Sequence, residues 1–401
     1  MRDVVISGIG LVSSIAGETQ GHRALFSPGV QPVYDRQATA PFPIHPIAAL
    51  AYDRLIPKKA DQRQMEPWQR IGAFAAGAAL EDAGLLGDAE RLSKTHMAVA
   101  AGVGERDIAV DEQLMAELRI APEPDLLLNA QLSSNLRPTL FLSQLPNLLA
   151  GNISIVFGVV GSSRTLLGEE AAGFDAIATT AARIRSGEID IGLVGGSYSA
   201  PRRDMLLLFG FCGALLQGEP APLWSRAARG GGMVLGSVGA FLVLESADHA
   251  GKRGARVAAF VGPAISERNR RTSGAVAEIA RKQWAKLEPR LRPGPVGVIS
   301  GASGAESATS EELSFLTDLA QRRDVFVRGP GGLIGHSIEA TAPANVALAA
   351  LSLREQAYFA PMSDAPIERA KTSSLEQIVV TSFGYAHSEG MILLTADGGG
   401  A

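Results

Sequence analysis

Cysteine is almost absent from this 401-residue sequence, and two other features that define protein classes are missing. The single cysteine, Cys212, excludes a disulfide framework and favours a reducing compartment, so we expect a cytoplasmic protein. No run of about 18 apolar residues occurs, so no membrane-spanning helix is expected. The N-terminal stretch, MRDVVISGIGLVSS, is too short and too early-charged for a signal peptide.

The charge balance argues against one class of partner, and the composition excludes disorder. The formal net charge is −4, which argues against nucleic-acid binding as the main task. The chain is 46% hydrophobic and 19% charged, as expected of a globular protein. Its length exceeds what one ordinary core accommodates, so we expect two core units.

Short apolar runs alternate with helical patterns along the chain. Continuous apolar runs of this length predict strands buried on both faces, and their alternation with helices indicates an α/β architecture. Helices are expected at 70–84 and 311–323, among others. The runs predicted as strands are 4–10, 97–103, 153–159, 191–196, 240–245, 257–262, 296–300, 324–329, 378–384 and 391–396.

The chain contains one structural unit twice. In each copy, at 166–188 and 333–356, Leu-Gly or Ile-Gly precedes an ionisable residue and an alanine-rich helix, and a strand with a glycine turn follows later. So much alanine predicts that the two helices pack centrally, between two sheets. We place the boundary at a charged, turn-rich link, which gives halves of 1–250 and 251–401. An excursion of helices and loops over about 104–150 falls outside the unit.

The duplicated unit resembles the thiolase fold and, more specifically, the elongating β-ketoacyl-acyl-carrier-protein synthases. VVISGIGLVSSIAG is similar to the first strand and turn of that family, and LIGHSIEATA resembles its second histidine motif. SFGYAHSEG resembles its C-terminal glycine-rich loop. The resemblance runs nearly end to end and implies a layered αβαβα arrangement. The activity of the family is that of a 3-oxoacyl-carrier-protein synthase, an acyltransferase.

The resemblance identifies four catalytic positions, of which one keeps its residue. The nucleophilic cysteine of the family corresponds to Glu170, and the first histidine corresponds to Gly301. The catalytic lysine corresponds to Gly331, whereas the second histidine is retained as His336. The phenylalanine that gates the pocket in the family corresponds to Tyr385.

Further substrate-binding positions follow from the same resemblance. Met233 lies in the segment similar to the central strand pair, and His387 lies in the loop that matches the pocket rim. A loop near the pantetheine entrance carries three arginines, for which a phosphate contact and a solvated charged loop both remain open. These arginines are Arg268, Arg270 and Arg271. The four other histidines, His22, His45, His96 and His249, lack metal-ligand spacing, so no metal is expected.

Condensation on this fold requires an acyl thioester on cysteine, made by attack of the thiolate on an acyl-carrier-protein thioester. Glu170 cannot form that thioester. Histidine N–H groups then hold the enolate oxygen that malonyl decarboxylation produces, and Gly301 removes one of the two. Loss of a single oxyanion donor costs about 10²–10³ in rate. Self-sufficient condensation is therefore not expected.

Glu170 nevertheless suits its place at the start of a helix. The unpaired N–H groups of a helix N-terminus favour an anion, and His336 occupies the matching place in the other half, where the two could pair. One interpretation is a helix-terminal acid with a structural histidine, and the other is a site remnant that still shapes the pocket. Glu169 is expected to be a simple helix-start acid.

Three functional hypotheses follow. The first is a non-condensing subunit, similar to a chain-length factor, that pairs with an active synthase and shapes its acyl tunnel. GSSRT-x-x-GEE resembles divergent homologues that serve very-long-chain fatty acids of lipid A. The second is altered chemistry, such as malonyl-carrier-protein decarboxylation with Glu170 and His336. The third is a nicotinamide-dependent oxidoreductase, which rests on the incomplete dinucleotide motif GIGLVSS.

Partners and assembly complete the expectations. The first two hypotheses imply an acyl carrier protein as partner, with the acyl chain presented on its phosphopantetheine and no cofactor of the chain's own. The segment Ile153–Phe157 is expected as a strand paired with its counterpart across a twofold, in a homodimer or in a heterodimer with an active paralogue. Cys212 lies among apolar neighbours and is expected to be an inert core cysteine.

Overall fold

The two halves of the chain build one ten-stranded sheet from the same topology twice. The computed structural model describes residues 1–102, 104, 108–134, 144–371, 374–385 and 387–398. The first five strands in sheet order are β4 (Ser163–Leu166), β3 (His96–Ala100), β5 (Ile191–Tyr198), β7 (Val238–Ser246) and β1 (Val4–Val12). The other five, from the opposite edge, are β10 (Val325–Arg328), β9 (Val296–Ile299), β11 (Gln377–Phe383), β12 (Ser388–Thr395) and β8 (Ala259–Arg268).

Pairing directions repeat between these two sets. In each set, the two strand pairs nearest the edge of the sheet are parallel, and the two pairs nearest its centre are antiparallel. Two residue pairs, Val5 with Phe260 and Ile6 with Ala259, join β1 to β8. A small parallel sheet of β2 (Ile44–His45) and β6 (Leu235–Gly236) lies apart. Because the halves share one sheet, the boundary near residue 250 stays a prediction.

Helices also repeat at equivalent places. The order β1-α3-β3-α8-β4-α9-β5-β7 in the first half corresponds to β8-α12-β9-α13-β10-α14-β11-β12 in the second. These helices are α3 (Pro67–Asp82), α8 (Leu148–Phe157), α9 (Glu170–Ser186), α12 (Ala275–Leu287), α13 (Ala308–Ala320) and α14 (Thr341–Arg354). The others are α1 (Tyr52–Leu55), α2 (Lys59–Gln64), α4 (Ala89–Lys94), α5 (Ile108–Ile120), α6 (Pro124–Ser134), α10 (Arg203–Phe211) and α11 (Ala247–Lys252). The 3₁₀ segments of the described residues are η1 (Thr19–Phe26), η2 (Leu223–Ser225), η3 (Ala227–Arg229), η4 (Glu288–Arg290), η5 (Pro330–Gly332) and η6 (Ile338–Ala340).

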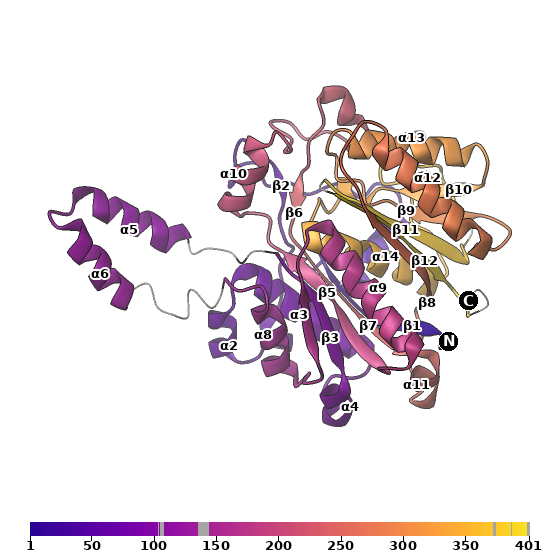
Figure 1. The fold of residues 1–401 in the computed structure, drawn as a ribbon, viewed down its shortest axis with the longest axis horizontal. Helices are drawn as coiled ribbons and strands as arrows, with labels where there is room; N and C mark the ends of the chain where they lie inside the picture. The colour runs from indigo at the N-terminus through magenta and orange to yellow at the C-terminus, as the bar shows by residue number, and fades with distance from the viewer. Residues whose placement is uncertain (103, 105–107, 135–143, 372–373, 386, 399–401) are drawn as a thin grey trace.

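Five layers result, and the alanine-rich helices occupy the middle one. Helices α9 and α14 contact each other and the strands of both halves, as predicted (Figure 1). Helix α3 packs on the outer face of the first half, and α12 and α13 pack on that of the second. The buried side chains form three clusters, one for each helical layer. Alanine keeps the central helices close to each other, because a small side chain leaves room for the facing backbone.

The motif GIGLVSS lies in strand β1 and its exit, and does not form the turn of a dinucleotide fold. A Cβ added at Gly8 would lie 2.3 Å from the carbonyl oxygen of Ala79, and one at Gly10 would lie 1.9 Å from that of Ala75. These glycines therefore let α3 approach the strand closely. The oxidoreductase hypothesis loses the motif on which it rested.

The predicted strand at 153–159 is wrong, because these residues belong mainly to helix α8 and its C-cap. Leu149, Ile153 and Phe157 are buried at a spacing of four, whereas Ile155 is 71% exposed. Because apolar residues also occupy the exposed face of α8, the sequence shows a continuous apolar run of the kind that is typical of a strand buried on both faces. Gly158, at φ 74°, ends the helix. The strand before the central helix is β4, which lies at the edge of the sheet.

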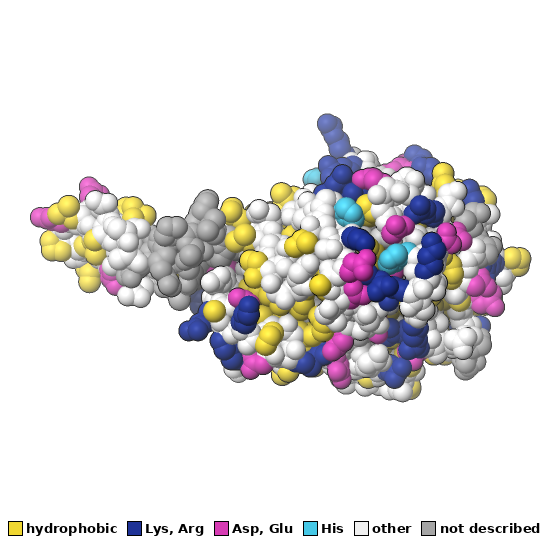
Figure 2. Space-filling view, turned by 90° about the horizontal axis from the view of Figure 1, so that it is seen from below, with side chains coloured by type: hydrophobic (Ala, Val, Ile, Leu, Met, Phe, Trp, Pro, Cys, Tyr) yellow, Lys and Arg dark blue, Asp and Glu magenta, His cyan; other side chains and the backbone are white. Residues whose placement is uncertain are grey.

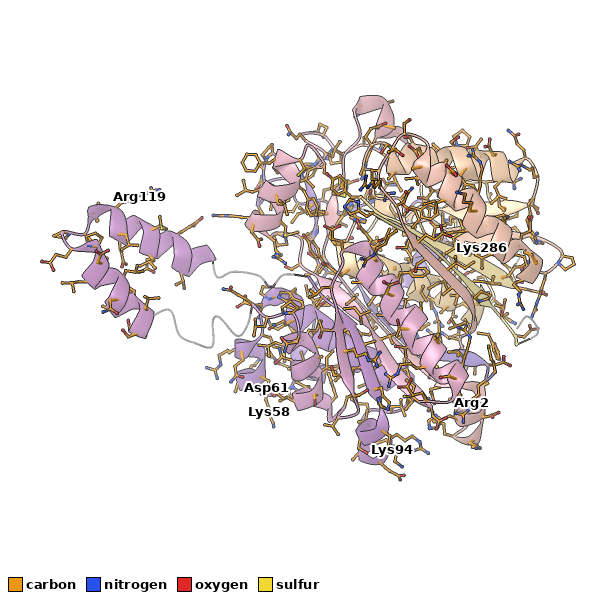
Figure 3. All side chains as sticks on the ribbon, viewed as in Figure 1. Arg2, Lys58, Asp61, Lys94, Arg119 and Lys286 are labelled. Carbon is orange, nitrogen blue, oxygen red and sulfur yellow. The ribbon has the colours of Figure 1, made fainter. Side chains whose placement is uncertain are left out.

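Helices α5 and α6 form a hairpin that projects from the body (Figure 1). Figure 2 shows apolar side chains on its surface. The exposed apolar residues of α5 and α6 include Met115, Ile120 and Leu126. Arg119 lies toward its outer end, whereas Lys286 lies on the outer surface of α12 (Figure 3). The hairpin corresponds to the predicted excursion, of which 105–107 and 135–143 lie outside the described residues. Across the part of the chain that is described, no helix combines the length and hydropathy needed to cross a bilayer.

Candidate functional site

The N-terminus of α9 carries a buried carboxylate. Strand β4 leads through Gly168, at φ 144°, into Glu169, which has the strained backbone angles φ 54° and ψ −132°. Glu170 is the first residue of the helix and is 3% exposed. The strain turns the chain sharply, so that the second glutamate enters the interior while the first stays exposed. Glu169 thus stands at the start of the helix, as the sequence predicts, but in a strained backbone conformation.

His336 reaches Glu170 from the other half of the chain. The distance from its Nε2 to Oε1 of Glu170 is 2.8 Å, and the imidazole is 1% exposed. The backbone N–H of Tyr385 donates to the same oxygen at 2.8 Å. The backbone of His336 is fixed by bonds with Val234 and Gly236. The structure therefore brings together three residues that the sequence assigned to the site: Glu170, His336 and Tyr385.

Electrostatics favour a charged Glu170. Burial alone raises the pKa of its carboxyl, but the hydrogen bond and charge of His336, with the N–H of Tyr385, hold that pKa well below its ordinary range. The pKa of Glu169 is raised, first by burial and then by the negative charge of Glu170. One glutamate is thus stabilised as the anion, whereas its neighbour is pushed toward the protonated form.

Arg271 holds the loop that caps Glu170. It forms an ion pair with the buried Glu389 and donates to the carbonyl oxygen of Gly384 at 2.8 Å. A Cβ added at Gly384 would lie 2.1 Å from Cδ of Glu170, so only glycine fits there. Arg271 is therefore a structural cation, and the predicted phosphate contact falls to the exposed Arg268 and Arg270.

Two glycines stand at the positions that the family resemblance assigns to the first histidine and the lysine, and a backbone carbonyl lies close to each. A Cβ at Gly301 would lie 2.6 Å from the carbonyl oxygen of Thr381, and one at Gly331 would lie 2.6 Å from that of Ala302. These distances are far inside van der Waals contact. The space that a histidine and a lysine would need has therefore been closed, and restoring those side chains would require the backbone to move.

Two buried acids near the site were missed from the sequence. Glu312, on α13, accepts hydrogen bonds from the hydroxyls of Ser300 at 2.8 Å and Thr381 at 2.6 Å, and it has no ion pair within the described residues. Burial raises its pKa to about 7. Burial also raises the pKa of Glu339, beside Gly102, to about 7. Neither follows a pattern in sequence: Glu312 stands among polar residues typical of a surface, and Glu339 interrupts an apolar segment without a recognisable partner nearby in the sequence.

Cys212 is exposed and does not lie in the core as predicted. It is the C-cap residue of α10, whose Phe211 is 88% exposed, so the apolar run around it covers a surface turn. The Cys212 thiol faces the hydroxyl of Tyr385, whose pKa is raised first by burial and then by this thiol. The Tyr385 ring packs edge-on against Phe209 at 5.8 Å. Cys212 thus lies on the solvent side of Tyr385, the residue that the resemblance assigns to the pocket gate.

The remaining predicted positions lie at varied depths. Met233 is 1% exposed and belongs to the central core. His387 is exposed, and its charge acts on Glu169. No group of three or more His, Cys, Asp or Glu residues could hold a metal ion in the ranges that the structure covers.

Comparisons with known proteins agree with this geometry. Residues 46–250 match the family model of the β-ketoacyl synthase, N-terminal domain. The 3-oxoacyl-[acyl-carrier-protein] synthase 2 of Vibrio cholerae is 24% identical over 372 residues, 84% of each chain. The tetracenomycin polyketide synthase ketoacyl synthase beta subunit of Streptomyces glaucescens is 31% identical over 219 residues, 51% of this chain and 52% of the relative. The ishigamide ketosynthase/chain length factor structure matches with a TM-score of 0.79 at 20% identity, covering 99% of this chain and 100% of that one. The predicted thiolase fold is confirmed.

Replacing Glu170 by glutamine should destabilise the chain by about 3–5 kcal/mol, because His336 then loses a buried charged partner. The double variant with His336→Gln should cost less than the sum, with a coupling energy of about 0.5–3 kcal/mol. Urea denaturation at pH 7 measures both. Glu169→Gln is the matched control and should cost little, because it removes a charge held beside Glu170. Additive costs would contradict the pairing.

Stability should depend on the buried acid at position 312. Because burial raises the pKa of Glu312, the folded chain keeps the proton on Glu312 at pH values where the unfolded chain has lost it. The free energy of unfolding therefore falls as pH rises from about 4.5 through about 7. Glu312→Gln carries no charge and should gain up to about 3 kcal/mol over wild type at pH 8, and little at pH 4. Urea denaturation at both pH values tests this, with the exposed Glu306→Gln as control. An equal gain at both values would refute it.

Proposed function

Because the chain belongs to the β-ketoacyl synthase family, we propose that it acts in fatty acid or polyketide assembly as a non-condensing subunit. It pairs with an active ketosynthase and shapes the tunnel that receives the growing acyl chain. The observation that carries the proposal is the hydrogen bond between the buried side chains of Glu170 and His336, because Glu170 stands at the position that the resemblance assigns to the nucleophile. Because the residue at this position carries a carboxylate and not a thiol, it cannot form the acyl thioester that condensation requires.

The enclosed glycines support the same proposal. Gly301 and Gly331 stand where a ketosynthase needs an enolate donor and its lysine, and backbone fills the space around both. One named relative is itself a ketoacyl synthase beta subunit, which is the kind of role proposed here. Within this class we assign the chain to very-long-chain fatty acids, on the resemblance of GSSRT-x-x-GEE to that group.

An acyl carrier protein is the proposed macromolecular partner in catalysis. It would bring the acyl chain on phosphopantetheine past Tyr385, at the outer side of Glu170. Arg268, the last residue of β8, and Arg270, in the segment after it, are exposed and give an acidic carrier protein cations to approach. The chain needs no cofactor of its own for this role.

Malonyl-carrier-protein decarboxylation is the second candidate. It is favoured by His336, which retains a ring N–H donor at the site where an enolate oxygen would form. That nitrogen already faces Glu170, so the carboxylate would have to move before the histidine could serve a substrate. The non-condensing role requires no such movement, and we prefer it.

The proposed subunit contact uses the free edge of β4. Met97 N–H donates to the carbonyl of Ser162 and Ala101 N–H to that of Leu166, so even-numbered residues face β3. Ser163 and Thr165 consequently turn their N–H groups outward. Large apolar side chains flank this edge with exposures of 71% at Ile155, 61% at Val160 and 60% at Leu167. An open apolar edge of this kind favours pairing with a second subunit.

Thr165→Pro should convert the dimer into a monomer. Proline removes only an outward N–H and leaves the ladder with β3 intact, because the bonds to β3 come from even-numbered residues. Sedimentation at micromolar concentration measures the change, alone and with a co-expressed paralogue. Thr165→Val is the matched control and should remain dimeric. A wild-type chain that is monomeric with every paralogue would refute the proposed contact.

Incubation with an acyl-carrier-protein thioester should give no acyl-enzyme adduct, because the pocket has no thiol nucleophile. Intact-mass spectrometry of the pure chain measures this, and an active synthase serves as the positive control. A stable adduct on Glu170 or Cys212 would overturn the non-condensing assignment. Carbon dioxide release from malonyl carrier protein above background, lost in His336→Ala without loss of stability, would favour decarboxylation instead.

A further inference from the structure

A second buried charge lies outside the site described above. Arg226, between η2 and η3, is 0% exposed. Its Nε donates to the carbonyl of Ala221 at 3.0 Å, but both terminal nitrogens lack a hydrogen bond of good geometry in the described part of the chain. No carboxylate forms an ion pair with it there. A buried cation without an anion is costly, so the guanidinium has unused capacity to bind one.

The groups around Arg226 are polar but neutral. The hydroxyl of Tyr34 faces the guanidinium, and the ring of Tyr34 lies 4.5 Å from that of His45. Burial, together with the charge of Arg226, lowers the pKa of His45 to about 3, so its ring is uncharged at pH 7. Both ring nitrogens of His45 also lack a hydrogen bond of good geometry among the described residues, where the backbone of Val33 is a nearby group. The cluster therefore holds one positive charge and several unused hydrogen-bonding groups.

This cluster stands directly behind the wall of a large groove. Tyr34 and Ala221 line a groove of about 1000 Å³, whose remaining wall is mostly apolar and includes Leu223, Trp224 and Met362. The charged residues of the rim are Arg36 and Asp364. Arg36 is already paired with Glu219 at 2.7 Å. Arg226 is thus a buried cation near the groove that has no counter-ion among the described residues.

The groove is separate from the Glu170–His336 pair and from β4, although Gly332 and Leu333 in its wall directly follow Gly331. Gly329, in its wall, follows β10, and β10 lies at the opposite edge of the sheet from β4. Glu170 and His336 do not line it. A ligand in the groove would therefore occupy neither the proposed subunit contact nor the pocket of the lost nucleophile.

We propose that this groove binds a monocarboxylate with an apolar body, whose carboxylate displaces the Tyr34 hydroxyl and pairs side-on with Arg226. The two terminal nitrogens of a guanidinium match the two oxygens of a carboxylate. One buried positive charge is balanced by a single negative charge, which favours a carboxylate over the more highly charged phosphate. The apolar wall accommodates an alkyl or aryl body. The terminal nitrogens are buried, so Tyr34 has to turn aside for entry.

Isothermal titration calorimetry of the full chain tests the assignment with four probes. Sodium octanoate and 3-phenylpropionate present the carboxylate on an alkyl and an aryl body, whereas 1-octanol lacks the charge and inorganic phosphate lacks the apolar body. We expect saturable binding of at least one carboxylate and none of octanol or phosphate. The tighter carboxylate identifies which body the groove prefers. Phosphate binding, or no saturable carboxylate binding, would overturn the proposal.

Three variants locate the carboxylate at Arg226. Arg226→Met removes the charge and should weaken binding by about 30-fold or more. It should fold, because an apolar side chain replaces an unpaired buried charge. Arg226→Lys keeps the charge without the side-on geometry and should bind the carboxylate more weakly than wild type. If Arg226→Met does not fold, Arg226→Lys alone tests whether the carboxylate binds at this position. Arg36→Met, at the rim, should bind as wild type does. Unchanged affinity in the Arg226 variants would refute the site, whatever the outcome for the proposed subunit role.

Discussion

One oxygen atom holds together three segments that are far apart in sequence. Oε1 of Glu170 accepts from the ring of His336 and from the backbone of Tyr385, each at 2.8 Å. His336 lies just before α14 in the chain, and Tyr385 lies just after β11. A carboxylate buried without these donors would cost several kcal/mol, so the two halves of the chain are required to meet at this point. The tight turn at Gly384 and its fixation by Arg271 are consequences of that requirement.

The same constraint accounts for the crowding at Gly301 and Gly331, the positions that the family resemblance assigns to catalysis. In the proposed non-condensing role, the hydrogen-bonded pair of Glu170 and His336 needs no open path for a reacting group. Backbone carbonyls of Ala302 and Thr381 have closed over the glycines at positions 331 and 301. Glu312 keeps two hydroxyl donors, but its burial outweighs them and raises its pKa. The site is internally consistent as a structural element, and each part fits the others only in this arrangement.

The sequence predicts much of this arrangement because duplication leaves a pattern. Buried strands and alanine-rich helices recur at matching places, and counting along them predicted that Glu170 and His336 would face each other. The prediction for Ile153–Phe157 failed because apolar residues occupy both the buried and the exposed face of α8. Only the place of this segment in the repeat, equivalent to that of α13, indicates a helix. Cys212 misled in the same way. Arg226 and Glu312 could not be predicted, because the burial of an isolated charge depends on tertiary packing and leaves no periodic signal.

The pairing of first and last strands within each half has a consequence for synthesis on the ribosome. Val4 of β1 pairs with Ser246 of β7, 242 residues later. At about 5–20 residues per second, the first strand waits about 12–50 s for this partner. The second half repeats the delay, since Phe260 of β8 pairs with Thr395 of β12, near the end of the chain. The nascent chain therefore carries an unpaired apolar strand for most of its translation, and a factor that shields VVISGIGLV during that time would improve its yield.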